Sequence, residues 1–193
     1  MENIKNSEQA TFLLQDEKIL LMPSDTVLGL FGVCTQNVIC RLNEIKGRKN
    51  KPYLVLVSSF EEVQRFAQIP DHCSSLLANV WPGPLTGIFK AQESATDCMV
   101  SSEGTIAIRV PDQKELLSIL QKVGPIFSTS ANLAGHSIPE SFTEIHSDLL
   151  NRVDAVFVDK NSHFPQIPST IIDCTGDKIS IIREGIIQIS DLK

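Results

Sequence analysis

Short apolar runs alternate with longer amphipathic stretches over most of this chain. The apolar runs, such as Lys18–Met22, have the length of buried strands. The stretches between them carry apolar residues at helical spacing, as in Asn37–Lys46. Such alternation is typical of an α/β protein with a mixed sheet. We therefore expect a sheet of parallel and antiparallel strands that is flanked by helices.

The pattern also predicts where each element lies. Expected strands cover Lys18–Met22, Tyr53–Val57, Leu85–Lys90, Thr105–Val110, Pro125–Ser128, Ala155–Val158, Thr170–Cys174 and Ile179–Arg183. Expected helices start at Ser7 and cover Asn37–Lys46, Ser59–Ala67, Asp71–Val80, Asp112–Lys122 and Ser141–Leu150, with Ser59, Asp71 and Asp112 as capping residues. The run Trp81–Pro84 contains two prolines and a glycine, so it must break regular structure.

Length and composition limit the architecture and the partners. The chain has 193 residues, of which 42% are hydrophobic, which suits one domain over residues 1–193. The formal net charge is −6 and the pI is about 5.2. A protein that neutralises many phosphates is normally basic, so tight general binding of nucleic acid is disfavoured. A local basic patch is still compatible with this charge.

Location and redox state follow from what the sequence lacks. We find no signal peptide and no apolar run near the roughly 18 residues of a membrane span, and we expect no membrane contact. The five cysteines are odd in number and widely spaced, which favours reduced thiols in the cytoplasm. The four histidines are scattered without metal-ligand spacing, and the P-loop, GxGxxG, HExxH and GxSxG motifs are absent.

A local basic segment stands out in this acidic chain. Four of the 17 Lys and Arg residues, namely Lys46, Arg48, Lys49 and Lys51, fall within six positions. Guanidinium and ammonium groups on a loop between a helix and a strand suit a triphosphate. The alternative is an ordinary solvated loop.

Two polar segments follow expected strands. Ser128–Asn132 carries three hydroxyls and an amide, which can hold phosphate or ribose oxygens, or can simply cap a helix. Pro23–Leu30 combines polar residues with a glycine that allows close approach of a ligand, or it forms a plain turn.

Two arginines stand near the ends of apolar strands. Arg109 ends the segment Thr105–Arg109, in which every second residue shares a face, and Arg183 follows Ile181 and Ile182. A charge in such a place needs a partner or a ligand. The two interpretations are a structural salt bridge and an anion-binding site.

The order of these segments resembles one known family. The blocks PSDTVLGL, KGR, WPGPLT, TIAIRVP, STSANLAG, PSTIID and IIREG, between about Met22 and Ile187, resemble the YrdC family from end to end. The resemblance implies a twisted mixed sheet with a concave, positively lined cleft. It also implies a nucleotidyltransferase that makes L-threonylcarbamoyl-AMP and pyrophosphate from L-threonine, bicarbonate or CO2, and ATP. A partner transferase complex would then modify an adenosine beside the tRNA anticodon.

The resemblance assigns roles to particular residues. The family's KxR and SxN motifs fall on Lys46, Arg48, Ser130 and Asn132, which are the expected catalytic residues. The expected ATP site contains Arg48, Lys51, Thr105, Ser130, backbone near Ile138, and Arg183. The expected L-threonine site contains Thr26, Arg109, Ser128 and Ser169, with Arg109 binding the carboxylate. Lys46 and Arg48 are expected to be exposed in the cleft.

The same resemblance limits cofactors and names alternatives. Mg²⁺ is expected to accompany ATP, no residue is assigned as a metal ligand, and no tightly bound organic cofactor is expected. A weak contact with tRNA is compatible with the basic segment. The alternatives are an RNA-binding module, which that segment would favour, and a paralogue that transfers another carbamoyl group.

Overall fold

One mixed sheet runs through the structure, which is a computed structural model that describes residues 2–47, 52–133, 135–158 and 166–188. The strands are β1 (Glu2–Asn3), β2 (Leu20–Met22), β3 (Gly29–Val33), β4 (Leu54–Leu56), β5 (Ala67–Gln68), β6 (Leu85–Ala91), β7 (Thr105–Arg109), β8 (Ile126–Ser130), β9 (Ala155–Val156), β10 (Thr170–Asp173) and β11 (Ser180–Arg183). The helices are α1 (Ser7–Gln15), α2 (Gln36–Lys46), α3 (Phe60–Phe66), α4 (Asp71–Val80), α5 (Lys114–Val123) and α6 (Ser147–Leu150), with 3-10 turns η1 (Asp97–Met99) and η2 (Phe142–Glu144).

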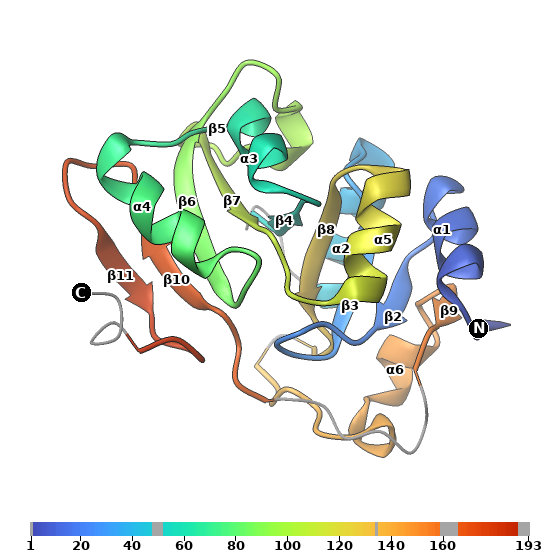
Figure 1. Cartoon of the computed structure of the whole chain (residues 1–193). Coiled ribbons are helices and arrows are strands. Elements are labelled where there is room, and N and C mark those ends of the chain that lie inside the picture. Colours follow the sequence, from blue (N-terminus) through green and yellow to red (C-terminus); the bar gives the residue numbers. More distant parts are fainter. Residues whose placement is uncertain (1, 48–51, 134, 159–165, 189–193) are drawn as a thin grey trace.

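The strand order confirms the expected mixed sheet. It is β1-β9-β2-β3-β8-β4-β7-β6-β10-β11, with β5 paired to β6. β4 runs parallel to β7 and antiparallel to β8, and β6 runs parallel to β10 and antiparallel to β7. The helices lie against this sheet, and α1 and α5 lie side by side (Figure 1).

Side-chain alternation along the strands builds two hydrophobic cores. Phe31 and Ile126 point into a smaller core that includes Leu14 of α1 and Leu116 of α5. Their strand neighbours point to the other side, where Phe127 joins the larger core that α2, α3 and α4 complete. Because successive strand residues face opposite sides, a strand buried on both faces reads as a continuous apolar run.

Strand β3 was not among the expected strands. Its sequence, GLFGV, contains two glycines, and glycine weakens the sequence signal of a strand. The structure gives a reason for one of them, because a Cβ built on Gly32 would lie 2.5 Å from Cγ1 of Val38 in α2. Helix α2 can therefore approach the sheet only because residue 32 has no side chain.

Several element boundaries also differ from expectation. Asn6, not Ser7, caps α1 through a hydrogen bond from the Gln9 amide, and neither Asp71 nor Asp112 is the capping residue of its helix. The expected helix Ser141–Leu150 is divided into η2 and α6. The two residues that separate these elements, Ile145 and His146, have non-helical backbone angles. β8 continues to Ser130 because its last residues pair with β3.

Trp81, at the start of the run Trp81–Pro84, packs into the core. Its indole Nε1 donates to the Leu85 carbonyl at 2.6 Å, and its ring lies edge-on to Phe89. Among the residues that the structure describes, no helix is both long enough and apolar enough to cross a membrane.

Replacement of Phe127 should test the central position of β8. Phe127 is fully buried between β3 and β4, so Phe127→Ala should lower the free energy of unfolding by about 3–5 kcal/mol in urea titrations. The matched control is Phe12→Ala on α1, whose side chain is 70% exposed and which should change stability by less than about 1 kcal/mol. Equal effects of the two substitutions would contradict this core.

Candidate active site

Lys46 ends helix α2 with its side chain directed into the protein. The next residue, Gly47, adopts the left-handed conformation that commonly ends a helix. The sequence suggested that the Lys46 side chain is exposed in a cleft, but this expectation is wrong for Lys46, because the residue is only 4% exposed. Its Nζ donates to the Ser130 carbonyl at 2.7 Å, to Oδ1 of Asn132 at 3.0 Å and to the Asn132 carbonyl.

Ser130 and Asn132 complete this arrangement, which we call the lysine cluster (Lys46, Ser130 and Asn132). Oγ of Ser130 donates to Oδ1 of Asn132 at 2.6 Å, and Nδ2 of Asn132 donates to the His136 carbonyl at 2.5 Å. The buried ammonium is therefore surrounded by oxygen acceptors, which offsets the cost of removing a charge from water. The structure thus brings the lysine of the KxR motif to both named residues of the SxN motif.

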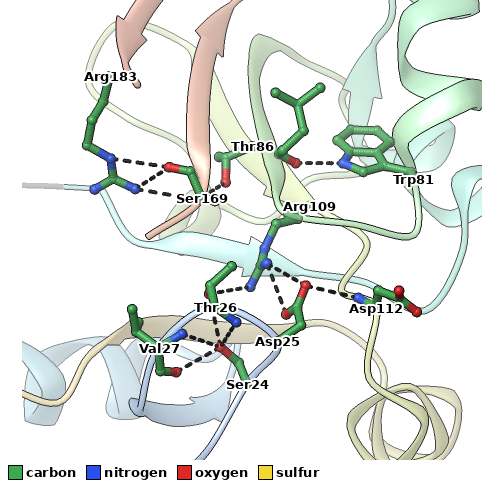
Figure 2. Close-up of polar contacts among 11 residues, drawn as sticks. Ser24, Asp25, Thr26, Val27, Trp81, Thr86, Arg109, Asp112, Ser169 and Arg183 are labelled. Atoms are coloured by element: carbon green, nitrogen blue, oxygen red, sulfur yellow. Dashed lines mark hydrogen bonds and ion pairs between the residues drawn. The ribbon is translucent and has the colours of Figure 1, made fainter. Parts of the chain in front are cut away.

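The loop between β2 and β3 is shaped by Ser24. Its Oγ accepts hydrogen bonds from the backbone amides of Thr26 and Val27, both at 3.2 Å, and donates to the Val27 carbonyl at 2.8 Å. A hydroxyl that bonds its own following backbone stabilises a tight turn. The turn holds Asp25 and Thr26 beside Arg109 (Figure 2).

Arg109 lies at the end of β7 and is only 1% exposed. Its Nη1 donates to both carboxylate oxygens of Asp25, each at 3.0 Å, and its Nη2 lies 3.5 Å from Oγ1 of Thr26 (Figure 2). The structure therefore shows the salt bridge that the sequence left as one of two interpretations. It does not use the whole guanidinium, because the buried Nε has no hydrogen-bond partner among the described residues.

Charges around Arg109 affect its protonation in opposite directions. Burial lowers the pKa of the Arg109 guanidinium, the Asp25 carboxylate raises it, and the positive charge of Arg183 lowers it further. Partial desolvation also lowers the pKa of Arg183, although this residue is exposed on β11. Two guanidinium groups thus lie near enough to repel each other, with one carboxylate paired to Arg109. This arrangement favours the arrival of a further anion.

Arg183 and Ser169 lie on the side of Arg109 that is opposite to Asp25 and Thr26 in the view of Figure 2. Nη2 of Arg183 donates to the Ser169 carbonyl at 2.8 Å and lies 3.4 Å from its Oγ. Oγ of Ser169 is 2.8 Å from Oγ1 of Thr86, and both residues are buried. We call Asp25, Thr26, Arg109, Ser169 and Arg183 the arginine cluster.

The two clusters are joined through the backbone. The Ala131 amide donates to the Leu28 carbonyl at 2.9 Å, which ties the residue after Ser130 to the end of the loop that carries Thr26.

Residues 12–185 match the model of the Sua5/YciO/YrdC family, which is described as telomere recombination. The chain belongs to the Sua5/YciO/YrdC family. The family resemblance that the ordered sequence blocks indicated is therefore confirmed.

Relatives of this family agree in sequence and in fold. A protein of Methanocaldococcus jannaschii named "Putative threonylcarbamoyl-AMP synthase" is 32% identical over 177 residues, which cover 91% of this chain and 83% of that protein. The crystal structure of P. abyssi Sua5 complexed with L-threonine matches 99% of this chain with a TM-score of 0.88 and 25% identity. This chain spans 59% of that Sua5 chain. E. coli YciO matches with a TM-score of 0.87 over 97% of its length, and at 22% identity this likeness shows the fold alone.

The remaining residues assigned by the family resemblance are placed less closely together. Thr105 begins β7, where its Oγ1 lies 2.7 Å from Oγ of Ser101, away from Arg109 at the other end of the strand. Ser128 is half-buried in β8 opposite Phe31. The Ile138 carbonyl accepts a hydrogen bond from Gln166 at 3.4 Å. Arg48 and Lys51 lie outside the described residues.

The structure adds residues that the sequence did not single out. Asp25 and Thr86 stand inside quoted family blocks, and both contact expected threonine-site residues. The available signal was a carboxylate in the polar run Pro23–Leu30 and a hydroxyl at the start of β6. Neither signal alone indicates which distant side chain it contacts.

A pocket of about 570 Å³ lies elsewhere on the molecule. It is lined by Gln68, Ile69, Pro70, His72, Lys90, Gln92, Cys174, Thr175, Gly176 and Asp177. None of these residues is assigned a role by the family resemblance. Among the described residues, no group of three or more His, Cys, Asp or Glu side chains could hold a metal ion.

The burial of Lys46 predicts an effect on stability. Lys46→Met removes the ammonium, keeps most of the length of the side chain and leaves the partly buried carbonyl oxygens of Ser130 and Asn132 without this donor. We expect a loss of about 1–3 kcal/mol in the free energy of unfolding, measured by urea titration. Lys178→Met, in the exposed turn between β10 and β11, is the control and should have little effect. Equal stability of Lys46→Met and the wild type would contradict the role of Lys46 in holding this segment.

Proposed function

We propose that this chain is an L-threonylcarbamoyladenylate synthase, which forms threonylcarbamoyl-AMP and pyrophosphate from L-threonine, bicarbonate or CO2, and ATP. The naming of its relatives and the L-threonine complex of P. abyssi Sua5 support this activity. The observation that carries the proposal is the buried Arg109, whose Nε has no partner among the described residues and whose neighbours include a hydroxyl from Thr26.

Within the arginine cluster, Thr26, Arg109 and Ser169 supply the proposed threonine site. A guanidinium binds a carboxylate through two parallel N–H groups, and Nε and Nη2 of Arg109 form one such edge. The hydroxyls of Thr26, Ser128 and Ser169 are the groups that the family resemblance adds to this site. Ser169 is held in place by Thr86 and Arg183, so its hydroxyl has a fixed position before a ligand arrives.

The lysine cluster is proposed to border the phosphates of ATP. Lys46 brings a positive charge and at the same time fixes the backbone of Ser130 and Asn132. Arg48 and Lys51 follow Lys46 in the sequence and are proposed to bind phosphate oxygens directly. Thr105, the backbone near Ile138, and Arg183 are the other proposed ATP contacts.

The chemistry needs positioning more than a protein nucleophile. The threonine amine attacks the carbon of CO2 or bicarbonate and becomes a carbamate, with a proton released when CO2 reacts and water released when bicarbonate reacts. A carbamate oxygen then attacks the α-phosphorus of ATP, the bond from that phosphorus to the bridging oxygen breaks, and pyrophosphate leaves. Preorganised cations stabilise the charge that develops on the phosphate oxygens, and fixed geometry aligns the reacting groups.

We further propose the surroundings of this reaction. Mg²⁺ would enter with ATP and would neutralise phosphate charge, since it is commonly held by substrate phosphates and water. The product would pass to a separate threonylcarbamoyl-transferase complex that modifies tRNA. Contact between this chain and tRNA should be weak, because the net charge is −6 and Lys46 is buried. The five free cysteines agree with a cytoplasmic location.

A pyrophosphate assay tests the activity directly. With ATP, Mg²⁺ and bicarbonate present, we expect pyrophosphate release that depends on added L-threonine. Mass spectrometry should identify threonylcarbamoyl-AMP as the second product. Release that is independent of L-threonine, or activity only with carbamoyl phosphate in place of threonine and bicarbonate, would overturn the proposal and favour a carbamoyl-transfer paralogue.

Replacement of Arg183 tests the division of the site. Arg183→Met should raise the KM for ATP by about tenfold or more, because it removes a charged contact, and should raise the KM for L-threonine less. Steady-state kinetics with each substrate varied in turn would measure both values. Arg65→Met on α3, away from both clusters, is the matched control and should change neither. A rise confined to the KM for L-threonine would contradict the assignment of Arg183 to ATP.

A further inference from the structure

We infer that Asp25 is a positioning residue that fixes which edge of Arg109 is presented to the substrate carboxylate. The inference rests on the proposed function, because it needs a carboxylated amino acid as the ligand of Arg109. It adds a residue with no assigned role, namely an acid in the loop between β2 and β3.

A guanidinium can offer a carboxylate two different edges. One edge consists of both terminal nitrogens, and the other consists of Nε and Nη2. Both oxygens of Asp25 are bonded to Nη1 of Arg109, which occupies the first edge. On the second edge, Nη2 has only a 3.5 Å contact with Thr26 and the buried Nε has no partner among the described residues. The edge made of Nε and Nη2 is therefore the one that remains for a ligand.

The position of Asp25 is itself fixed by the fold. Its Oδ2 also accepts a hydrogen bond from the Asp112 amide at 3.1 Å, and its side chain is 8% exposed. The turn built around Ser24 sets the backbone on which Asp25 stands. The Asp25 carboxylate is therefore fixed in position, and its bonds to Nη1 limit rotation of the Arg109 guanidinium. The edge made of Nε and Nη2 keeps its orientation.

The ion pair of Arg41 and Asp154 serves as a comparison for the pair of Arg109 and Asp25. Arg41 donates to Asp154 at 2.8 Å, and Asp154 also accepts from the Ile19 amide, so this aspartate makes the same two kinds of contact as Asp25. The Arg41 and Asp154 side chains are 31% and 29% exposed, so water can satisfy whatever the protein does not. Arg109 is too buried for that, and a donor without a partner in such a place costs stability unless a ligand uses it.

The charges favour the same conclusion. Arg109 and Arg183 carry two positive charges, and Asp25 supplies one negative charge directly paired to Arg109. A ligand carboxylate on the open edge would balance the second positive charge. Asp25 thus balances the charge of Arg109 without occupying the position proposed for the ligand.

The test compares Asp25→Asn with Asp154→Asn by isothermal titration calorimetry against L-threonine, L-threoninamide and ATP. L-Threoninamide has no carboxylate. We expect Asp25→Asn to weaken L-threonine binding at least tenfold, while its affinity for L-threoninamide and ATP stays within about twofold of the wild type. Asp154→Asn should leave all three affinities within about twofold of the wild type. A structural role of Asp25 alone would weaken both amino acid ligands equally and would overturn the inference.

A measurement on the wild type guards against a variant that fails to fold. The Nε–H resonance of Arg109 in ¹⁵N-edited NMR, assigned with Arg109→Lys, should shift when L-threonine is added and should not shift with L-threoninamide. Absence of L-threonine binding to the wild type would overturn the proposed function and this inference together. Wild-type binding without a shift of this resonance, or with unchanged affinity in Asp25→Asn, would overturn the inference alone.

Discussion

The pairing of β3 with β8 is the constraint on which the site depends. It aligns Gly29 with Ser130, and the adjoining bond from Ala131 to Leu28 extends this alignment beyond the strands. Side chains alternate along a strand, so a slip of one residue would exchange the two faces of β8. It would also withdraw the backbone oxygens of Ser130 and Asn132 from Lys46. The buried apolar residues Phe31 and Phe127 make that slip costly, because each belongs to a different core.

The two clusters differ in the acceptors that contact the buried positive charge. Lys46 donates to backbone and amide oxygens of Ser130 and Asn132, which are neutral acceptors. Arg109 is bonded to a carboxylate, so its charge is largely balanced before any ligand arrives. This difference matches the charges of the proposed substrates. A triphosphate carries several negative charges and attracts cations strongly, whereas an amino acid carboxylate carries one negative charge and gains mainly from orientation.

The fold was more predictable than the contacts within the site. Most strands and helices follow from hydrophobic periodicity, because apolar runs such as Ile19–Met22 must be buried. β3 could not be found in this way, because the reason for Gly32 is a tertiary contact. Val38 of α2 packs so close to Gly32 that a side chain there would clash. The burial of Lys46 could not be found either, because its acceptors are backbone oxygens 84 and 86 residues away. Ordered motifs identified the family, but they do not show which side chains contact each other.

The salt bridge of Arg109 shows why a charged residue on an apolar strand resists a simple choice between structure and function. Asp25 satisfies one part of the guanidinium and so makes its burial tolerable, while Nε is left without a partner among the described residues. A fully satisfied arginine would be more stable but would have no donor to offer. A completely unpaired one would be expelled from so buried a place or would distort the strand end. The incomplete pairing is therefore the state in which a buried cation can both persist in the folded protein and bind an anion.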